Sequence, residues 1–331
     1  MDEKTTDQAQ NMTPSFSPGR TRRWATKIAQ WFVVALLLFA LYHALFGRFF
    51  PLSPIILGFS RQEYISATVY HHGQYESSQL SYLNDVIPYE ETYHGISFRW
   101  KPAVFLCKDD CEYRRLTGSK ARFTSINGRV FVSQQAQDDA RQGKIVLRTY
   151  LTHELSHCLL QQRVSILRSM RMPKWLLEGT AMDCARQVGT GNYPAKSTVY
   201  ELIAGGAFCE PSDFGTYLNA EKGTALSCSV ENKATFFYSE FGCFVEFLRS
   251  SHGAQRYRAF LEDVVECDNL DVEESFVRVF GIPLSDEFRR FTAQVRKAVL
   301  RGSTGPRVTP GSRTRQIDKS GPCQRCPLAV K

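Results

Sequence analysis

The sequence predicts an α+β fold with an N-terminal transmembrane helix, a small mixed sheet and a mostly helical C-terminal half. Residues 28–47 form an apolar run without Asp, Glu, Lys or Arg. Two short segments, 102–107 and 129–133, are rich in β-branched and aromatic residues and are expected to be strands. From Gly143 onward apolar residues recur at helical spacing, so strands precede helices. The roughly 250 residues after the apolar run suffice for one well-buried domain.

The apolar run 28–47 has about the twenty residues that a bilayer requires, with aromatic residues near its ends. A cleaved signal peptide or a buried core helix is the alternative, and the long leader and the lack of an A-x-A site disfavour the former. The positive-inside rule predicts a single-pass cell-membrane protein with residues 1–27 in the cytoplasm and the remainder in the periplasm or outside the cell. That rule applies because four basic residues and no acidic residue directly precede the run: Arg20, Arg22, Arg23 and Lys27.

The chain is expected to divide into five parts. The C-terminal part is rich in Gly, Pro, Ser and Arg and is expected to be disordered. The parts are a cytoplasmic polar arm at 1–27, the anchor at 28–47, a juxtamembrane region at 48–99 without a firm structural prediction, a folded domain at 100–299, and a basic tail at 300–331. The expected helices span 144–162, 174–187, 196–206, 234–251, 254–266, 271–279 and 284–299.

The basic charge of the chain lies at its two ends. The formal net charge is +8, yet residues 48–300 hold 29 basic and 29 acidic side chains. Nucleic-acid binding requires a positive surface, so it is not expected of the folded domain. The basic tail is expected to be solvated, with contact to anionic lipid or cell wall as the alternative.

The sequence HELSH, formed by residues 153–157, lies inside a largely apolar helical segment. Histidines four residues apart lie on the same face of a helix, so His153 and His157 can bind one metal ion. Zinc accepts neutral imidazole, and a catalytic zinc has three protein ligands and a fourth position for water. Glu154 is placed to take a proton from that water. The alternative, an ordinary surface helix, is disfavoured by the apolar flanks.

Glu178 stands 21 residues after His157, within the sequence WLLEGTA on a second helical pattern. HELSH followed by WLLEGTA resembles the gluzincin metallopeptidases, and especially the compact bacterial peptidase MA-like families. The resemblance implies that one zinc ion is bound by His153, His157 and Glu178, with Glu154 as the general base. Metzincins are excluded, since no glycine and third histidine follow HELSH at their spacing.

The resemblance to gluzincins covers roughly residues 100–295 and implies a gluzincin-like domain. It also implies that residues 127–133 form the edge strand of the sheet. In aminopeptidase-type gluzincins a tyrosine on a downstream helix stabilises the oxyanion, which implies this catalytic role for Tyr238. Packing of the Tyr238 ring in the helical core is the alternative. Asp183 is a candidate to orient one of the ligating histidines.

All ten cysteines follow the apolar run, and an even number on the exported side of a membrane indicates disulfides. Buried free thiols are the alternative. The C-x-x-C in the tail is expected to form a local disulfide and to have no catalytic role. Proximity suggests three further pairs: Cys107 with Cys111, Cys209 with Cys228, and Cys158 with Cys184.

These observations predict a membrane-anchored zinc peptidase that hydrolyses peptide bonds of exported proteins or peptides through zinc-activated water, with Glu154 as general base. Its expected partners are a protein or peptide substrate and the membrane, entered through residues 28–47. The alternative is a catalytically inactive, zinc-stabilised binding or assembly factor at the cell envelope. The intact Glu154 favours the enzyme, because a structural zinc site needs no general base. A DNA-associated protease is disfavoured by the anchor and the neutral domain.

Overall fold

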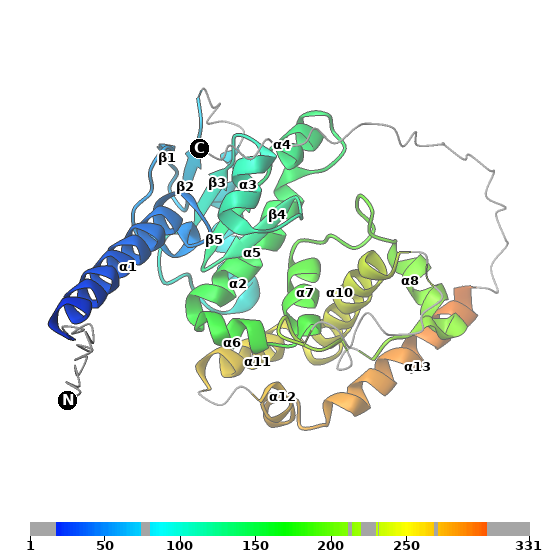
Figure 1. Ribbon diagram of the computed structural model, residues 1–331. Coiled ribbons are helices and arrows are strands. Elements are labelled where there is room, and N and C mark those ends of the chain that lie inside the picture. The colour runs from blue at the N-terminus through cyan, green and yellow to red at the C-terminus, as the bar shows by residue number, and fades with distance from the viewer. Residues whose placement is uncertain are drawn as a thin grey trace, which may run out of the picture.

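The computed structural model describes residues 18–73, 80–210, 214–219, 230, 232–267 and 271–302. The predicted polar arm up to residue 17, the tail from residue 303 with Cys323 and Cys326, and also Cys228 lie outside the described residues. The described chain has a five-stranded mixed sheet followed by a mostly helical C-terminal half (Figure 1). The predicted α+β class is therefore confirmed.

Helix α1, Pro18–Phe46, extends away from the rest of the described chain (Figure 1). Within its segment Thr26–Phe46, the most apolar window of 18 residues has a mean hydropathy of 2.0 and is not buried against the protein. The helix is thus long and apolar enough to cross a membrane. A secretion signal near an N-terminus would have the same length and composition.

The sheet has the strand order β1-β2-β3-β5-β4. The two central pairs, β2 with β3 and β3 with β5, are parallel, whereas the outer pairs are antiparallel. The first two strands and helix α2 come from the region 48–99, for which the sequence predicts no structure. The bounds are β1 Ser60–Glu63, β2 Thr68–His71, α2 Leu83–His94, β3 Ala103–Leu106, β4 Phe123–Ile126 and β5 Arg129–Val132.

Strands β4 and β5 form a hairpin with a two-residue turn at Asn127 and Gly128. Both turn residues have positive φ angles, 52° and 69°, as a type I′ turn requires. The hairpin places β4 outside β5, at the edge of the sheet. The expectation that 127–133 is the edge strand is therefore wrong, because β5 pairs with β3 on one side and β4 on the other.

Helix α5, Leu147–Arg163, joins the sheet to the helical half. Its residues Leu155 and Cys158 share an apolar core with Val104 and Val130 of the sheet. The remaining helices before and around it are short. Their bounds are η1 Phe50–Leu52, α3 Asp110–Thr117, α4 Gln134–Arg141, α6 Ile166–Arg171, α8 Lys196–Leu202 and the π-helical turn η3 Ile203–Ala207.

Helix α10, Lys233–His252, lies beside α7, Lys174–Cys184, in the helical half (Figure 1). An aromatic core surrounds them, in which the ring centroid of Trp175 lies 5.5 Å from that of Phe244 and 6.2 Å from that of Phe288. The closing helices are α11 Ala254–Glu266, α12 Val272–Phe280 and α13 Leu284–Gly302. Most helix ends agree with the predicted ranges within three residues. The helix predicted over 196–206 is the exception, because α8 ends at Leu202 and is followed by a π-helical turn that contains Gly206, whose φ is 97°.

Glycines allow α7 and α10 to approach each other closely. A Cβ atom added to Gly179 would lie 2.7 Å from the main-chain oxygen of Phe241. A Cβ atom added to Gly242 would lie 2.9 Å from Cβ of Met182. Side chains at these positions would push the helices apart. The close contact therefore fixes α7, and with it Glu178, against α10.

Cys158 and Cys184 are buried free thiols, so the predicted disulfide between them is wrong. The Sγ atom of Cys158 donates to the main-chain oxygen of Gly128 at 2.7 Å. The Sγ atom of Cys184 instead donates to Oε2 of Glu90 at 3.4 Å. The two thiols do not meet because one faces the sheet hairpin and the other faces α2.

The predicted disulfide between Cys107 and Cys111 is also wrong. Cys107 has a free thiol that is buried after strand β3, whereas Cys111 is exposed on α3. Their side chains therefore lie in different environments despite their proximity in sequence. The predicted disulfide between Cys209 and Cys228 lies outside the described residues, because Cys228 is not among them.

Candidate metal centre

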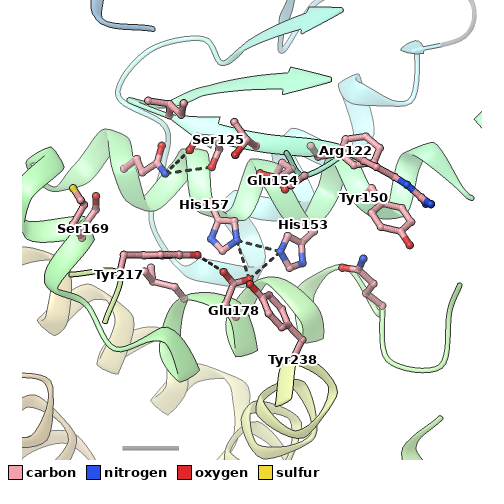
Figure 2. Close-up of a pocket in the computed structure, with 18 of the residues that line it drawn as sticks. Arg122, Ser125, Tyr150, His153, Glu154, His157, Ser169, Glu178, Tyr217 and Tyr238 are labelled. Atoms are coloured by element: carbon pink, nitrogen blue, oxygen red, sulfur yellow. Dashed lines mark hydrogen bonds and ion pairs between the residues drawn. The ribbon is translucent and has the colours of Figure 1, made fainter. Parts of the chain in front are cut away.

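Helix α5 carries three of the predicted site residues, His153, Glu154 and His157. The two histidines are one helical turn apart and project from the same face, with their Nε2 atoms 3.1 Å apart. Both are largely buried, with exposures of 7 % and 8 %. Figure 2 shows their imidazole rings directed toward α7.

Glu178 of α7 meets both histidines. Its Oε2 atom lies 3.2 Å from Nε2 of His153 and 3.4 Å from Nε2 of His157. The structure thus brings together the three residues that the sequence predicts as ligands, in a nearly equilateral triangle of donor atoms. This buried group could hold a metal ion.

The charges in this group favour a cation. Burial alone would raise the pKa of Glu178, but the attraction of His157 and His153 outweighs it and holds that pKa far below its usual range. Burial alone would lower the pKa of His157, but Glu178 and Glu154 reverse the shift and raise it. An ionised carboxylate facing two imidazole nitrogens is an arrangement that metal ions occupy in proteins.

Two tyrosines face the carboxylate of Glu178 (Figure 2). Tyr217 Oη donates a hydrogen bond to Oε1, which leaves Oε2 directed at the histidines. Tyr238 of α10 lines the cleft, and the charge of Glu178 together with burial raises its pKa well above the usual value. Burial and Glu178 raise the pKa of Tyr217 in the same way. Both phenols therefore stay protonated at neutral pH and can donate hydrogen bonds.

The segment that carries Tyr217 is attached to the beginning of α7. The main-chain N–H of Lys174 donates to the oxygen of Gly215 at 2.9 Å, and Thr216 forms a β-bridge with Pro173. The Nζ atom of Lys174 also lies 5.3 Å from the centroid of the Tyr217 ring. These contacts hold Tyr217 beside Glu178, although 39 residues separate the two in the chain.

Glu154 lies beside the group of three, next to Ser125 of strand β4 (Figure 2). Burial raises its pKa and Glu178 adds to the rise, whereas His157, His153 and the Ser125 hydroxyl oppose it. The net effect is a raised pKa. Glu154 therefore holds a proton more readily than an exposed glutamate does, which suits a group that accepts and returns protons.

A cleft of about 840 Å³ opens over these residues. Edge strand β4 and its flanks, residues 121–127, form one wall, and Tyr217 and Tyr238 lie on the opposite side (Figure 2). Ser169 of α6 marks one end of the cleft, and Arg122 and Tyr150 mark the other (Figure 2). The cleft gives the candidate metal centre access to solvent and leaves room for an extended ligand.

The prediction that Asp183 orients a ligating histidine is wrong. Its Oδ2 atom accepts hydrogen bonds from Oη of Tyr93 and from Nη1 of Arg249. Five residues along a helix correspond to about 500°, so Asp183 projects about 140° away from Glu178. Nδ1 of His153 is buried without a hydrogen-bond partner among the residues that the structure describes.

The chain matches no protein-family model and no curated protein. The function of the site is therefore inferred from its own residues and geometry. Sequence reasoning missed Tyr217, for which no local pattern exists, and strand β4 with Ser125. For β4 a signal was present, since Asn127-Gly128 is a strong hairpin turn and a strand should precede it.

Proposed function

We propose that this chain is a membrane-tethered zinc peptidase of the gluzincin type, acting on exported proteins or peptides. The observation that carries the proposal is the convergence of His153, His157 and Glu178, with the carboxylate of Glu154 beside them in an open cleft. A structural zinc site is closed by four protein ligands and needs no neighbouring base. The cleft and Glu154 therefore favour catalysis over a zinc-stabilised binding factor.

The three donor atoms fit zinc. Tetrahedral ligands about 2.0–2.1 Å from a zinc ion lie about 3.3 Å from one another. The edges of the triangle measure 3.1, 3.2 and 3.4 Å. Two imidazoles and a carboxylate are also the ligand set of known zinc hydrolases. One zinc ion at this centre is therefore part of the proposal.

When bound there, zinc supplies a Lewis acid for the scissile carbonyl and lowers the pKa of water. The carboxylate of Glu154 takes a proton from the attacking water and passes it to the leaving amine. Tyr238 retains its phenol proton and donates a hydrogen bond to the oxyanion that develops on the substrate. Tyr217 holds Oε1 of Glu178, so that Oε2 remains turned to the histidines.

Strand β4 supports a peptide as the substrate. It is an edge strand, and it lines the cleft together with Glu154. An extended peptide can add to such an edge through main-chain hydrogen bonds, while side-chain pockets provide selectivity. A peptide lying along β4 would pass over Glu154 and the candidate metal centre.

Helix α1 supports attachment to a membrane. It is long and apolar enough to span a bilayer, and the basic residues in its first turns, ahead of the apolar run, favour a cytoplasmic N-terminus. In the proposed topology the cleft faces the periplasm or the exterior, where it meets exported proteins.

Proteomics of exported proteins tests the proposed function in cells. Cells with the wild type are expected to contain peptide fragments that are missing from cells with Glu154→Gln, because this substitution keeps the metal ligands and removes the base. If the two strains contain the same fragments, the binding or assembly factor becomes the better interpretation.

A further inference from the structure

A second buried group of possible metal ligands lies outside the cleft. Glu90 and His94 belong to α2, and Cys184 is the last residue of α7. Their ligand atoms all lie within 4.8 Å of one another. The three residues are enclosed, with exposures of 0 %, 0 % and 1 %, and none of them lines the cleft.

The carboxyl group of Glu90 lacks a complete set of partners. Its Oε2 atom lies 3.3 Å from Nδ1 of His94 and 3.4 Å from Sγ of Cys184. Its Oε1 atom is buried without a hydrogen-bond partner among the described residues. Buried polar atoms in proteins are nearly always satisfied, so an unsatisfied oxygen beside a thiol and an imidazole points to a missing ligand.

We propose that Glu90, His94 and Cys184 bind a second zinc ion, in a structural site between α2 and α7. Sulfur, imidazole nitrogen and carboxylate oxygen are the donors that zinc accepts. With bonds of about 2.0–2.3 Å, tetrahedral neighbours lie about 3.3–3.6 Å apart, which agrees with the two measured distances. The three residues occupy three positions around the ion, and Oε1 of Glu90 covers the remaining side as the second oxygen of a bidentate carboxylate, so no position is left for water.

The charges balance in this second site. A zinc ion carries two positive charges, and the Glu90 carboxylate with the Cys184 thiolate carries two negative charges. The enclosed group is then neutral, as a site without contact to solvent requires. Relative to a folded site in which Glu90 and Cys184 are both protonated, binding of the ion releases two protons. Because the three ligands are enclosed, the ion is taken up while the chain folds.

Ser156 connects the second site to the candidate metal centre. Its Oγ atom lies 2.8 Å from Nε2 of His94, and it directly precedes His157 on α5. When Nε2–H of His94 donates its hydrogen bond to Oγ of Ser156, the lone pair of the imidazole is on Nδ1, on the side of Glu90. The second zinc would therefore join α2 to α7 and, through Ser156, brace the helix that carries HELSH. The proposal of a second zinc site does not depend on the proposed peptidase function.

A metal-free network is the competing arrangement. In it Nδ1 of His94 donates to the main-chain oxygen of Glu90 at 2.9 Å, and Ser156 donates to Nε2. Glu90 and Cys184 then both keep their protons, and Oε1 of Glu90 keeps no partner. The two arrangements differ in metal content and in sulfur ligation, and both can be measured.

Zinc content of the purified full-length protein is the first test. We expect two zinc ions per chain in the wild type, and one each in Glu178→Gln and in Cys184→Ser. Cys158→Ser is the matched control, because it also removes a buried thiol but not a proposed ligand. Cys158→Ser is expected to keep both zinc ions. If it also loses one ion, the loss seen in Cys184→Ser is explained by the buried polar hydroxyl and not by removal of a ligand.

Replacement of zinc by cobalt is the second test, and it can be read on the wild type alone if Cys184→Ser does not fold. The second site contains the sulfur ligand and the first does not, so thiolate-to-cobalt charge-transfer absorption is expected in the wild type and in Glu178→Gln. One metal ion without this absorption would overturn the second site. One metal ion with it would support the second site and remove the candidate metal centre, which separates the two proposals.

Discussion

Replacement of Gly179 by alanine tests whether the contact of α7 with α10 positions Glu178. The added Cβ would lie 2.7 Å from the oxygen of Phe241, and ordinary contact begins at 3.4 Å, so the helices must separate by about 0.7 Å. Overpacking of this kind costs about 1–3 kcal/mol, and the higher helix propensity of alanine offsets about 1 kcal/mol. We therefore expect the free energy of unfolding to fall by up to about 2 kcal/mol.

The same shift should weaken zinc binding. Metal–ligand distances vary by only about 0.2 Å, so a movement of about 0.7 Å beside Glu178 is expected to reduce zinc affinity about tenfold or more. Urea denaturation measures the stability, and competition with a chelator measures the affinity. Gly205→Ala is the control, because a Cβ there meets no atom within 4 Å. Wild-type zinc affinity in Gly179→Ala would refute the role of helix spacing.

Tyr217→Phe removes the hydrogen bond to Oε1 of Glu178. Zinc affinity, measured by competition with a chelator, is expected to fall about 10–100-fold. An unchanged affinity would show that the phenol does not hold the carboxylate. The pKa of Glu154 is raised by burial, and the protonated acid cannot accept a proton. The value of kcat/KM should therefore fall on the acid side as Glu154 takes up a proton, and the same acid limb in the residual activity of Glu154→Gln would contradict this role. A reporter enzyme fused after residue 100 should be active only when it functions outside the cytoplasm, and cytoplasmic activity would reverse the proposed topology.

The sequence predicts the helical half well because its signals are local. Helices α10 and α11 have apolar residues at regular helical spacing, and both lie within a residue of their predicted ranges. The grouping of His153 with His157 is also local, since one helical turn fixes it. Glu178 joins them only through the packing of α7, so its role follows from the resemblance in sequence and not from local helix geometry.

The parts that the sequence did not predict depend on contacts between distant residues. Strands β1 and β2 have four residues each, too few for a reliable alternation, and they are stabilised by pairing with β3. Tyr217 reaches Glu178 because its segment binds the beginning of α7. The disulfide predictions failed because proximity in sequence does not fix which way a thiol points, as Cys158 and Cys184 illustrate.

The most direct measurement is the cleavage of an unbiased peptide library by the purified full-length protein, with zinc content measured on the same samples. Glu154→Gln should retain the zinc content of the wild type and lose about 10²–10⁴-fold in turnover, since it removes only the base. Cleavage at the wild-type rate by Glu154→Gln, or no cleavage by a zinc-loaded wild type, would contradict a peptidase whose base is Glu154.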